Sequence, residues 1–242
     1  MKRMQVWRTL GVGTAFAAML LMGMTSTSKH VGARDDEDGN ESEEARIQRG
    51  FEIAPVPLNL EGKNRALVGL GSYMVNAVGD CNGCHSAGPM TEFAGPSGNP
   101  YFRTPPFSGT KKINAATYLG GGRDFGPVGS VPHLYSRNLT PDNSGLPIGG
   151  HSYSEFVEIM RHGSDLDHVH PNCTNAPGTP LSPPNCFAPP FNGNLLQVMR
   201  WPFFKDMTDH ELRAIYEYLS AVPCNPGQVI AGAPYLQNTC PL

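Results

Sequence analysis

Apolar residues recur at the spacing of an amphipathic helix over residues 64–78. Positions i, i+3, i+7 and i+11 of this stretch are Leu67, Leu70, Met74 and Val78. They predict a helix with one apolar face that runs directly into the sequence DCNGCHS. Glycines at two positions inside the stretch weaken an isolated helix by roughly 1 kcal/mol each, and they favour close approach of a second helix.

Two further helices carry their own start signals. The sequence SYSE, from Ser152, is a capping-box pattern ahead of an apolar face over residues 153–162. The sequence TDHE, from Thr208, repeats that pattern before a helix over residues 209–222. No stretch alternates with period two for long enough to predict a sheet, and residues 86–150 are expected to be loop with short hairpins. The predicted fold class is mostly α, with long Gly- and Pro-rich loops.

The N-terminus has the layout of a secretory signal. Basic residues precede an uncharged, mostly apolar run of 15 residues, 10–24, and small polar residues follow it. The run is shorter than the roughly 20 residues that a spanning helix needs, but no A-x-A cleavage site follows it. Residues 1–28 are therefore interpreted as a signal peptide or an N-terminal anchor that would associate the chain with a membrane. Both readings place the remaining chain in the periplasm or another exported location.

Acidic residues crowd the segment that follows. Seven acids fall within ten residues: Asp35, Asp36, Glu37, Asp38, Glu41, Glu43 and Glu44. Such a segment buries too little apolar surface to offset its ordering entropy, so residues 29–59 are predicted to be a flexible acidic linker. Residues 60–242 are then the single folded domain. From Ala45 onward 13 bases oppose 14 acids, and this balance gives no support for nucleic acid binding.

Four of the six cysteines bracket loops. Cys173 and Cys186 enclose a Pro-rich insert, and Cys224 and Cys240 enclose the C-terminal tail. An even number of cysteines in an exported chain suggests disulfides. We therefore expect two local disulfides, Cys173–Cys186 and Cys224–Cys240. Each would stabilise the fold by about 3 kcal/mol on a chain-entropy estimate.

The other two cysteines, Cys81 and Cys84, precede His85 in the sequence CNGCH. A structural zinc site would need further ligands, and a thiol–disulfide switch would place the pair at a helix start near a βαβ pattern. Covalent attachment of haem c explains the histidine as well, because two thiols add to the vinyl groups and the adjacent imidazole binds iron. The sequence favours haem c over the zinc and thiol-switch readings.

Iron bound in this way takes a sixth ligand or keeps an open position. A Met thioether is the usual ligand in electron transfer, and the exported chain offers Met74, Met90, Met160, Met199 and Met207. Met199 is favoured because it lies in a loop with the sequence LLQVMRWPFF. There Pro202 and the neighbouring aromatic residues would restrict the backbone and exclude water. Met207 is the second candidate.

The chain resembles a known family in four segments: LGSYMVNAVGDCNGCHS, YLGGGRDFG, SRNLTPDNSGLPIGGHSYSEFVEIMRHG and MRWPFFKDMTDHELRAIYEYLSAVP. They are similar to the class I c-type cytochrome domains of bacterial exported proteins, and to the single-haem modules of dehydrogenase subunits. The resemblance covers residues 66–223. It implies a cytochrome c-like helical domain with thioethers at Cys81 and Cys84, the proximal ligand at His85 and the distal ligand at Met199.

The resemblance also implies contacts outside the ligand set. Gly71 and Tyr73 of the first helix would pack on Tyr216 of the last helix. The RNLTPD stretch would lie near the haem, with a contact from Asn138 or Thr140. The chain departs from the family where Arg200, rather than Pro, follows Met199.

A haem with both axial positions filled passes single electrons and has no position for a substrate. The resemblance therefore implies a single-electron carrier, not an enzyme, either alone or as the electron-transfer subunit of a periplasmic oxidoreductase. Its partners would be a donor dehydrogenase and an acceptor oxidase or cytochrome. The alternatives are a haem enzyme or gas-sensing module with a labile distal ligand, and a scaffold subunit whose haem is structural.

Overall fold

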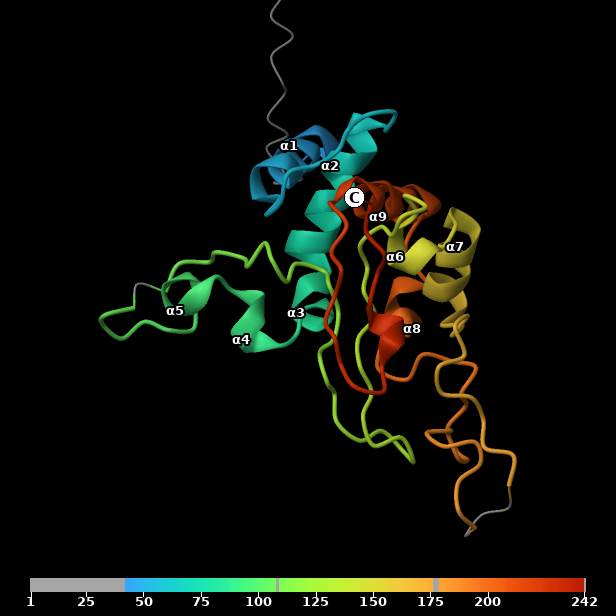
Figure 1. Cartoon of the computed structure of the whole chain (residues 1–242). Coiled ribbons are helices and arrows are strands. Elements are labelled where there is room, and N and C mark those ends of the chain that lie inside the picture. The colour runs from blue at the N-terminus through green and yellow to red at the C-terminus, as the bar shows by residue number, and fades with distance from the viewer. Residues whose placement is uncertain (1–41, 108, 176–178, 242) are drawn as a thin grey trace, which may run out of the picture. The chain divides into compact units, whose positions relative to one another are not determined.

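A computed structural model describes residues 42–107, 109–175 and 179–241 of the chain. Helices predominate there, and strand pairing is limited to isolated bridges such as Phe93–Ile113 and Asp124–Tyr135. The prediction of a mostly α fold is confirmed (Figure 1). In these residues no helix is long and apolar enough to cross a membrane. The expected signal or anchor, residues 1–28, lies outside the described residues.

In chain order the elements are α1 (Glu43–Ile53), α2 (Arg65–Tyr73), the π-helix η1 (Met74–Val78), α3 (Cys81–His85), α4 (Pro89–Glu92), α5 (Gly95–Gly98), α6 (Pro147–Gly150), α7 (Tyr153–His162), α8 (Trp201–Phe204), α9 (Asp209–Ala221) and η2 (Pro234–Leu236). Helices α1, α2, α7 and α9 are the longest of the described helices, and the others span one or two turns.

The expected flexible linker, residues 29–59, is wrong where α1 forms. Ile47 and Phe51 give α1 a small apolar face, and both side chains contact Gly69 of α2. Between them Gly50 lets the two backbones meet, since a Cβ on Gly50 would lie 1.8 Å from the Gly69 carbonyl oxygen. The acid-rich composition of residues 35–44 predicted a linker. The apolar residues that stabilise α1, Ile47 and Phe51, come after that stretch.

The three predicted helices are confirmed, with their caps. The hydroxyls of Ser152 and Thr208 accept the backbone N–H of Glu155 and Glu211, and both capping boxes are complete. Gly163 ends α7 in the left-handed conformation. Buried residues of α2, η1, α7 and α9 form the core: Val68, Met74, Val75, Phe156, Met160, Leu212, Ile215, Tyr218 and Leu219.

Helices α2 and α9 approach each other closely at Gly71. A Cβ on Gly71 would lie 1.9 Å from the Ala214 carbonyl oxygen, and Tyr218 packs beside it. These two residues, rather than the expected Tyr216, are the nearest neighbours of Gly71. Tyr216 packs instead against the rings of Tyr153 and Phe156 on α7.

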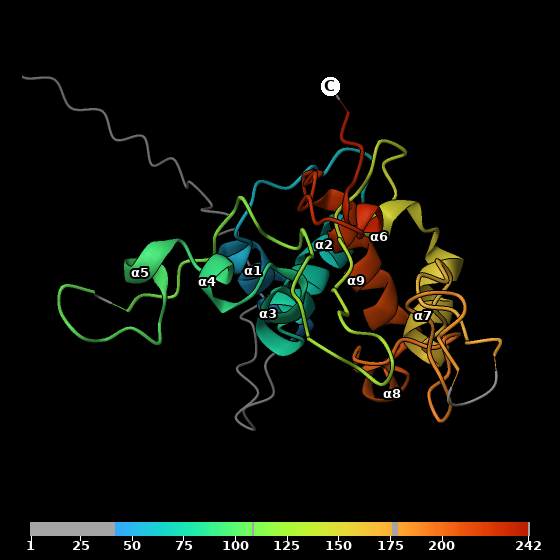
Figure 2. The same cartoon turned by 60° about the horizontal axis from the view of Figure 1, so that its bottom comes forward.

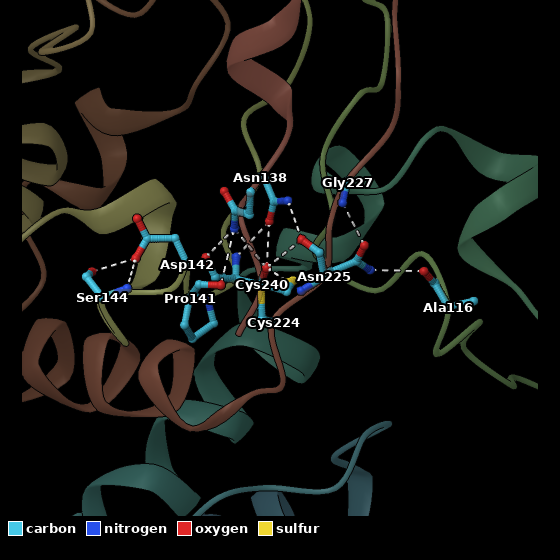
Figure 3. Close-up of a disulfide and its surroundings, with 11 residues drawn as sticks. Ala116, Asn138, Pro141, Asp142, Ser144, Cys224, Asn225, Gly227 and Cys240 are labelled. Atoms are coloured by element: carbon cyan, nitrogen blue, oxygen red, sulfur yellow. Dashed lines mark hydrogen bonds between the residues drawn. A yellow bond between two sulfur atoms is a disulfide. The ribbon is translucent and has the colours of Figure 1, made fainter. Parts of the chain in front are cut away.

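Both expected disulfides are present, Cys173–Cys186 at 1.95 Å and Cys224–Cys240 at 2.03 Å between sulfurs. They indicate an oxidising environment. Beside Cys224 the tail is fixed to the body by Asn225, whose carbonyl accepts Asn138 Nδ2 and whose own Nδ2 donates to the carbonyl of Ala116, each at 2.9 Å (Figure 3).

We predict that Gly71→Ala lowers the free energy of unfolding by about 1–3 kcal/mol, because the added methyl group overpacks the α2–α9 contact. Urea unfolding of the full chain measures the change. Gly62→Ala is the control, since a Cβ there meets nothing within 4 Å and only the left-handed backbone is strained. Equal losses in the two variants would contradict the close contact.

Candidate haem-binding site

One cavity of about 540 Å³ lies among α3, α7, α8 and α9, a volume within the usual range for small-molecule sites. The four side chains singled out from the sequence all line it: Cys81, Cys84, His85 and Met199. Much of the remaining wall is apolar, with side chains such as Leu139, Phe156, Leu196, Phe204, Ile215 and Leu219.

The local fold of α3 explains how three of these side chains come together. Cys81, Cys84 and His85 stand at i, i+3 and i+4 of a single helical turn, and residues at this spacing share one helix face. On another side of the turn, buried Asn82 accepts the backbone N–H of Leu119 at 2.9 Å through Oδ1. Asp80, with φ of 45°, redirects the chain from η1 into this turn.

The two thiols of α3 lie in different surroundings. Burial raises the pKa of Cys81 to about 12, and the negative charges of Asp80 and Cys84 add to the effect. The exposed fraction of Cys81 is nevertheless intermediate and Cys84 is exposed, because the cavity opens beside them.

One ring nitrogen of His85 is hydrogen-bonded to the protein, and among the described residues the other has no hydrogen-bond partner. Its Nδ1 lies 2.8 Å from the carbonyl oxygen of Arg137. A carbonyl can only accept, so Nδ1 carries the proton and Nε2 keeps its lone pair. Burial lowers the pKa of His85, and the imidazole is therefore neutral, as iron ligation requires.

Arg137 is itself held on both sides. Its guanidinium pairs with Asp165 and Asp167, each at 2.8 Å, and lies over the ring of Tyr235 at 5.0 Å. All four residues line the cavity. These ion pairs hold the loop that contains Arg137, and the backbone carbonyl of Arg137 orients the ring of His85 on α3.

The candidate methionines differ in whether they line the cavity and in how deeply they are buried. Met90 is 73% exposed and does not line the cavity, so the structure removes it as a ligand to a group bound there. Met74 and Met160 line the cavity but are buried in the core. Met199 and Met207 line it while packing only at the edge of the core. The site therefore keeps Met199 and Met207, the first and second candidates from the sequence.

Sequence reasoning missed the polar wall made by Arg137, His151, Asp165 and Asp167. His151 Nε2 lies 3.4 Å from Asp167 Oδ1, and the half-buried His151 lines the cavity. Charge patterning could not reveal this cluster, because its members are spread over 31 positions of the chain. The sequence signal available was that Arg137 and His151 both lie in the segment SRNLTPDNSGLPIGGHSYSEFVEIMRHG.

Asn138 and Thr140, from which the resemblance implies a haem contact, take part in other contacts of the fold. Neither residue lines the cavity. Asn138 Oδ1 accepts the backbone N–H and the hydroxyl of Thr140, at 3.0 and 2.8 Å. Thr140 Oγ1 in turn accepts the Asn225 backbone N–H at 2.9 Å. These side chains hold the tail in place, because a buried polar group needs its partners inside the fold.

Comparisons of the chain with protein-family models, with curated proteins and with solved structures found no match. The interpretation of the site therefore depends on its own chemistry. Two thiols, an imidazole with a free lone pair and a thioether around an apolar cavity are a donor set that suits a covalently bound haem.

We predict that the pKa of His151 lies above its ordinary value, because the hydrogen bond to Asp167 favours the protonated ring more than burial disfavours it. This pair stabilises the fold fully below the unfolded-state pKa of about 6.5, and the contribution disappears as pH rises through the folded-state pKa. NMR titration of Asp167→Asn should show a lower pKa for His151. Asp124→Asn, which removes the partner of His133, should leave the pKa of His151 unchanged, and a fall in both variants would contradict the assignment.

Proposed function

We propose that this protein is a single-electron carrier with one haem c attached through Cys81 and Cys84, alone or as the electron-transfer subunit of an exported oxidoreductase. The observation that carries the proposal is the shared face of α3, where both thiols and His85 open onto one apolar cavity. Bound there, haem supplies one-electron exchange at its iron.

The side chains of this chain would hold and tune that group. Cys81 and Cys84 would fix one edge of the ring, and His85 would offer Nε2 to the iron. The carbonyl of Arg137 keeps the proton on Nδ1 and so fixes the tautomer and the plane of the imidazole. The apolar wall excludes water, which reduces the reorganisation that accompanies a change of charge.

We propose that the Met199 thioether would hold the iron together with His85. Its loop comes directly before α8, and Arg200 at the start of α8 lies over the ring of Phe203 at 4.9 Å. This stacking gives Arg200 a role in holding the Met199 loop at the position where Pro was expected from the resemblance. With two protein ligands on the iron no position remains for a substrate, and the protein would not be an enzyme.

The location supports a role between exported redox proteins. The two disulfides fit an oxidising compartment, and the apolar N-terminal run fits export. We propose a dehydrogenase as the donor and an oxidase or another cytochrome as the acceptor.

A second candidate is a haem enzyme or gas-sensing module with a labile distal ligand. The polar wall favours it, because His151 and Asp167 bring a proton-bearing pair to the cavity. A labile ligand would open the iron to a small molecule near that pair.

We predict that the oxidised protein shows the weak long-wavelength absorption band of an iron–methionine bond and that Met199→Ala abolishes it, because the thioether is lost. Absorption spectra of the purified exported protein test this. Met207→Ala and Met160→Ala are the matched controls and should keep the band. Loss of the band in Met207→Ala alone would transfer the ligand role to Met207.

The same preparation separates the two candidate functions. A six-coordinate carrier should bind no carbon monoxide at neutral pH in its reduced state, because both axial positions are filled. Carbon monoxide binding by the wild-type protein, together with a high-spin spectrum, would contradict the carrier and support the enzyme or sensor.

A further inference from the structure

Residues 89–107 and 109–115 form an arm that extends away from the helices in both views (Figure 1, Figure 2). The arm contains α4 and α5 and turns back on itself. Its two sides are joined by the Phe93–Ile113 bridge and by the backbone N–H of Ala94, which donates to the Lys112 carbonyl at 2.8 Å. It is thus an ordered, hydrogen-bonded extension of the fold.

Aromatic side chains on this arm face solvent. Tyr101 is 81% exposed and Phe107 is 40% exposed, and the rings of Phe102 and Phe107 lie 6.1 Å apart. The exposed Pro105 and Pro106 between them restrict the backbone. Rigid exposed aromatic residues are typical of the centre of a protein interface, because they bury much area at a small entropic cost.

The arm also carries the basic surplus of the fold. Three bases, Arg103, Lys111 and Lys112, oppose the single acid Glu92, a net charge of +2. The rest of the chain from residue 42 onward carries ten bases and 15 acids, a net charge of −5. None of the three bases forms an ion pair with the described residues.

The base of the arm lies beside the mouth of the cavity. Helix α4 packs on α3, whose Cys84 is exposed at that mouth. A partner that covers the arm down to α4 would therefore lie beside α3.

We propose that the arm is the docking surface for an electron-transfer protein with an acidic rim around an apolar centre. The exposed aromatic residues of the arm fit the apolar centre, and Arg103, Lys111 and Lys112 fit the acidic rim. The rest of the fold carries a net negative charge, so the overall charge distribution favours approach of an acidic partner to the arm. A contact of this kind is small and transient, as electron-transfer encounters are. The proposal rests on the electron-carrier function.

The test uses the full exported protein with its haem and a strongly acidic protein donor, reduced plant-type [2Fe–2S] ferredoxin. One electron passes from the donor cluster to the ferric haem, and no proton or other reactant is needed. Stopped-flow absorption gives the second-order rate constant as the salt concentration rises from about 0.01 M to about 0.15 M, over which the Debye length falls from about 30 Å to about 8 Å.

Charge reversal on the arm should slow this reaction by about tenfold at the lowest salt concentration, and the difference should shrink as salt is added. The variant is Lys111→Glu with Lys112→Glu, and the matched control, Lys63→Glu with Lys205→Glu, makes the same change of charge elsewhere. Tyr101→Ser with Phe107→Ser should slow the reaction at every salt concentration. Equal rates for the arm variant and the control would overturn the proposal.

Two other occupants of the arm give different results. A membrane surface is one such occupant. The proposal would be overturned in its favour if the wild-type protein sedimented with phosphatidylglycerol vesicles, the arm variant did not, and the two reacted with ferredoxin at the same rate. Concentration-dependent dimerisation that disappears in the arm variant, again with an unchanged rate, would overturn it in favour of a second copy. A chain without covalent haem would refute the carrier function before this test begins.

Discussion

The close approach of α2 and α9 at Gly71 sets the position of everything around the cavity. With no side chain at Gly71, the backbone of α2 meets the Ala214 carbonyl directly. One turn further on, Asn76 of η1 donates to the hydroxyl of Tyr218 at 3.1 Å and accepts the hydroxyl of Tyr118 at 2.5 Å. The end of the first helical unit is thereby fixed to α9, and α3 starts from a determined point.

This arrangement brings distant segments of the chain to one cavity. The first helical unit ends in α3, which carries the thiols and His85. Helix α9 contributes Ile215 and Leu219 to the lining, and the loop before α8 contributes Met199. The carbonyl of Arg137 then settles which nitrogen of His85 faces the cavity. Helix packing positions the residues of the site, and this hydrogen bond sets the tautomer of His85.

The sequence predicted those parts of the fold whose signals are local. Helix spacing and capping boxes located α2, α7 and α9, because these depend on residues three or four apart. The loop-bracketing cysteines identified both disulfides for the same reason. The motif CNGCH and the Met199 loop predicted four residues that do border one cavity, although their role as haem ligands stays a proposal.

The parts that were missed depend on contacts between distant segments. Helix α1 is stabilised through Gly50 against Gly69, and no count of acids in one segment could show that pairing. The wall of Arg137, His151, Asp165 and Asp167 exists only once three loops converge. Asn138 and Thr140 have side chains suited to a cofactor contact, but in the fold they hydrogen-bond to Asn225 of the C-terminal tail, which lies more than 80 positions away in the sequence.

The most direct test of the account is the intact mass of the exported protein in denaturant. A haem c attached through Cys81 and Cys84 adds the mass of one haem to the chain and survives denaturation, and the added mass is absent when both cysteines are replaced by serine. The account predicts this result for the wild-type protein. A wild-type chain without added mass, with two thiols free to react at Cys81 and Cys84, would contradict it.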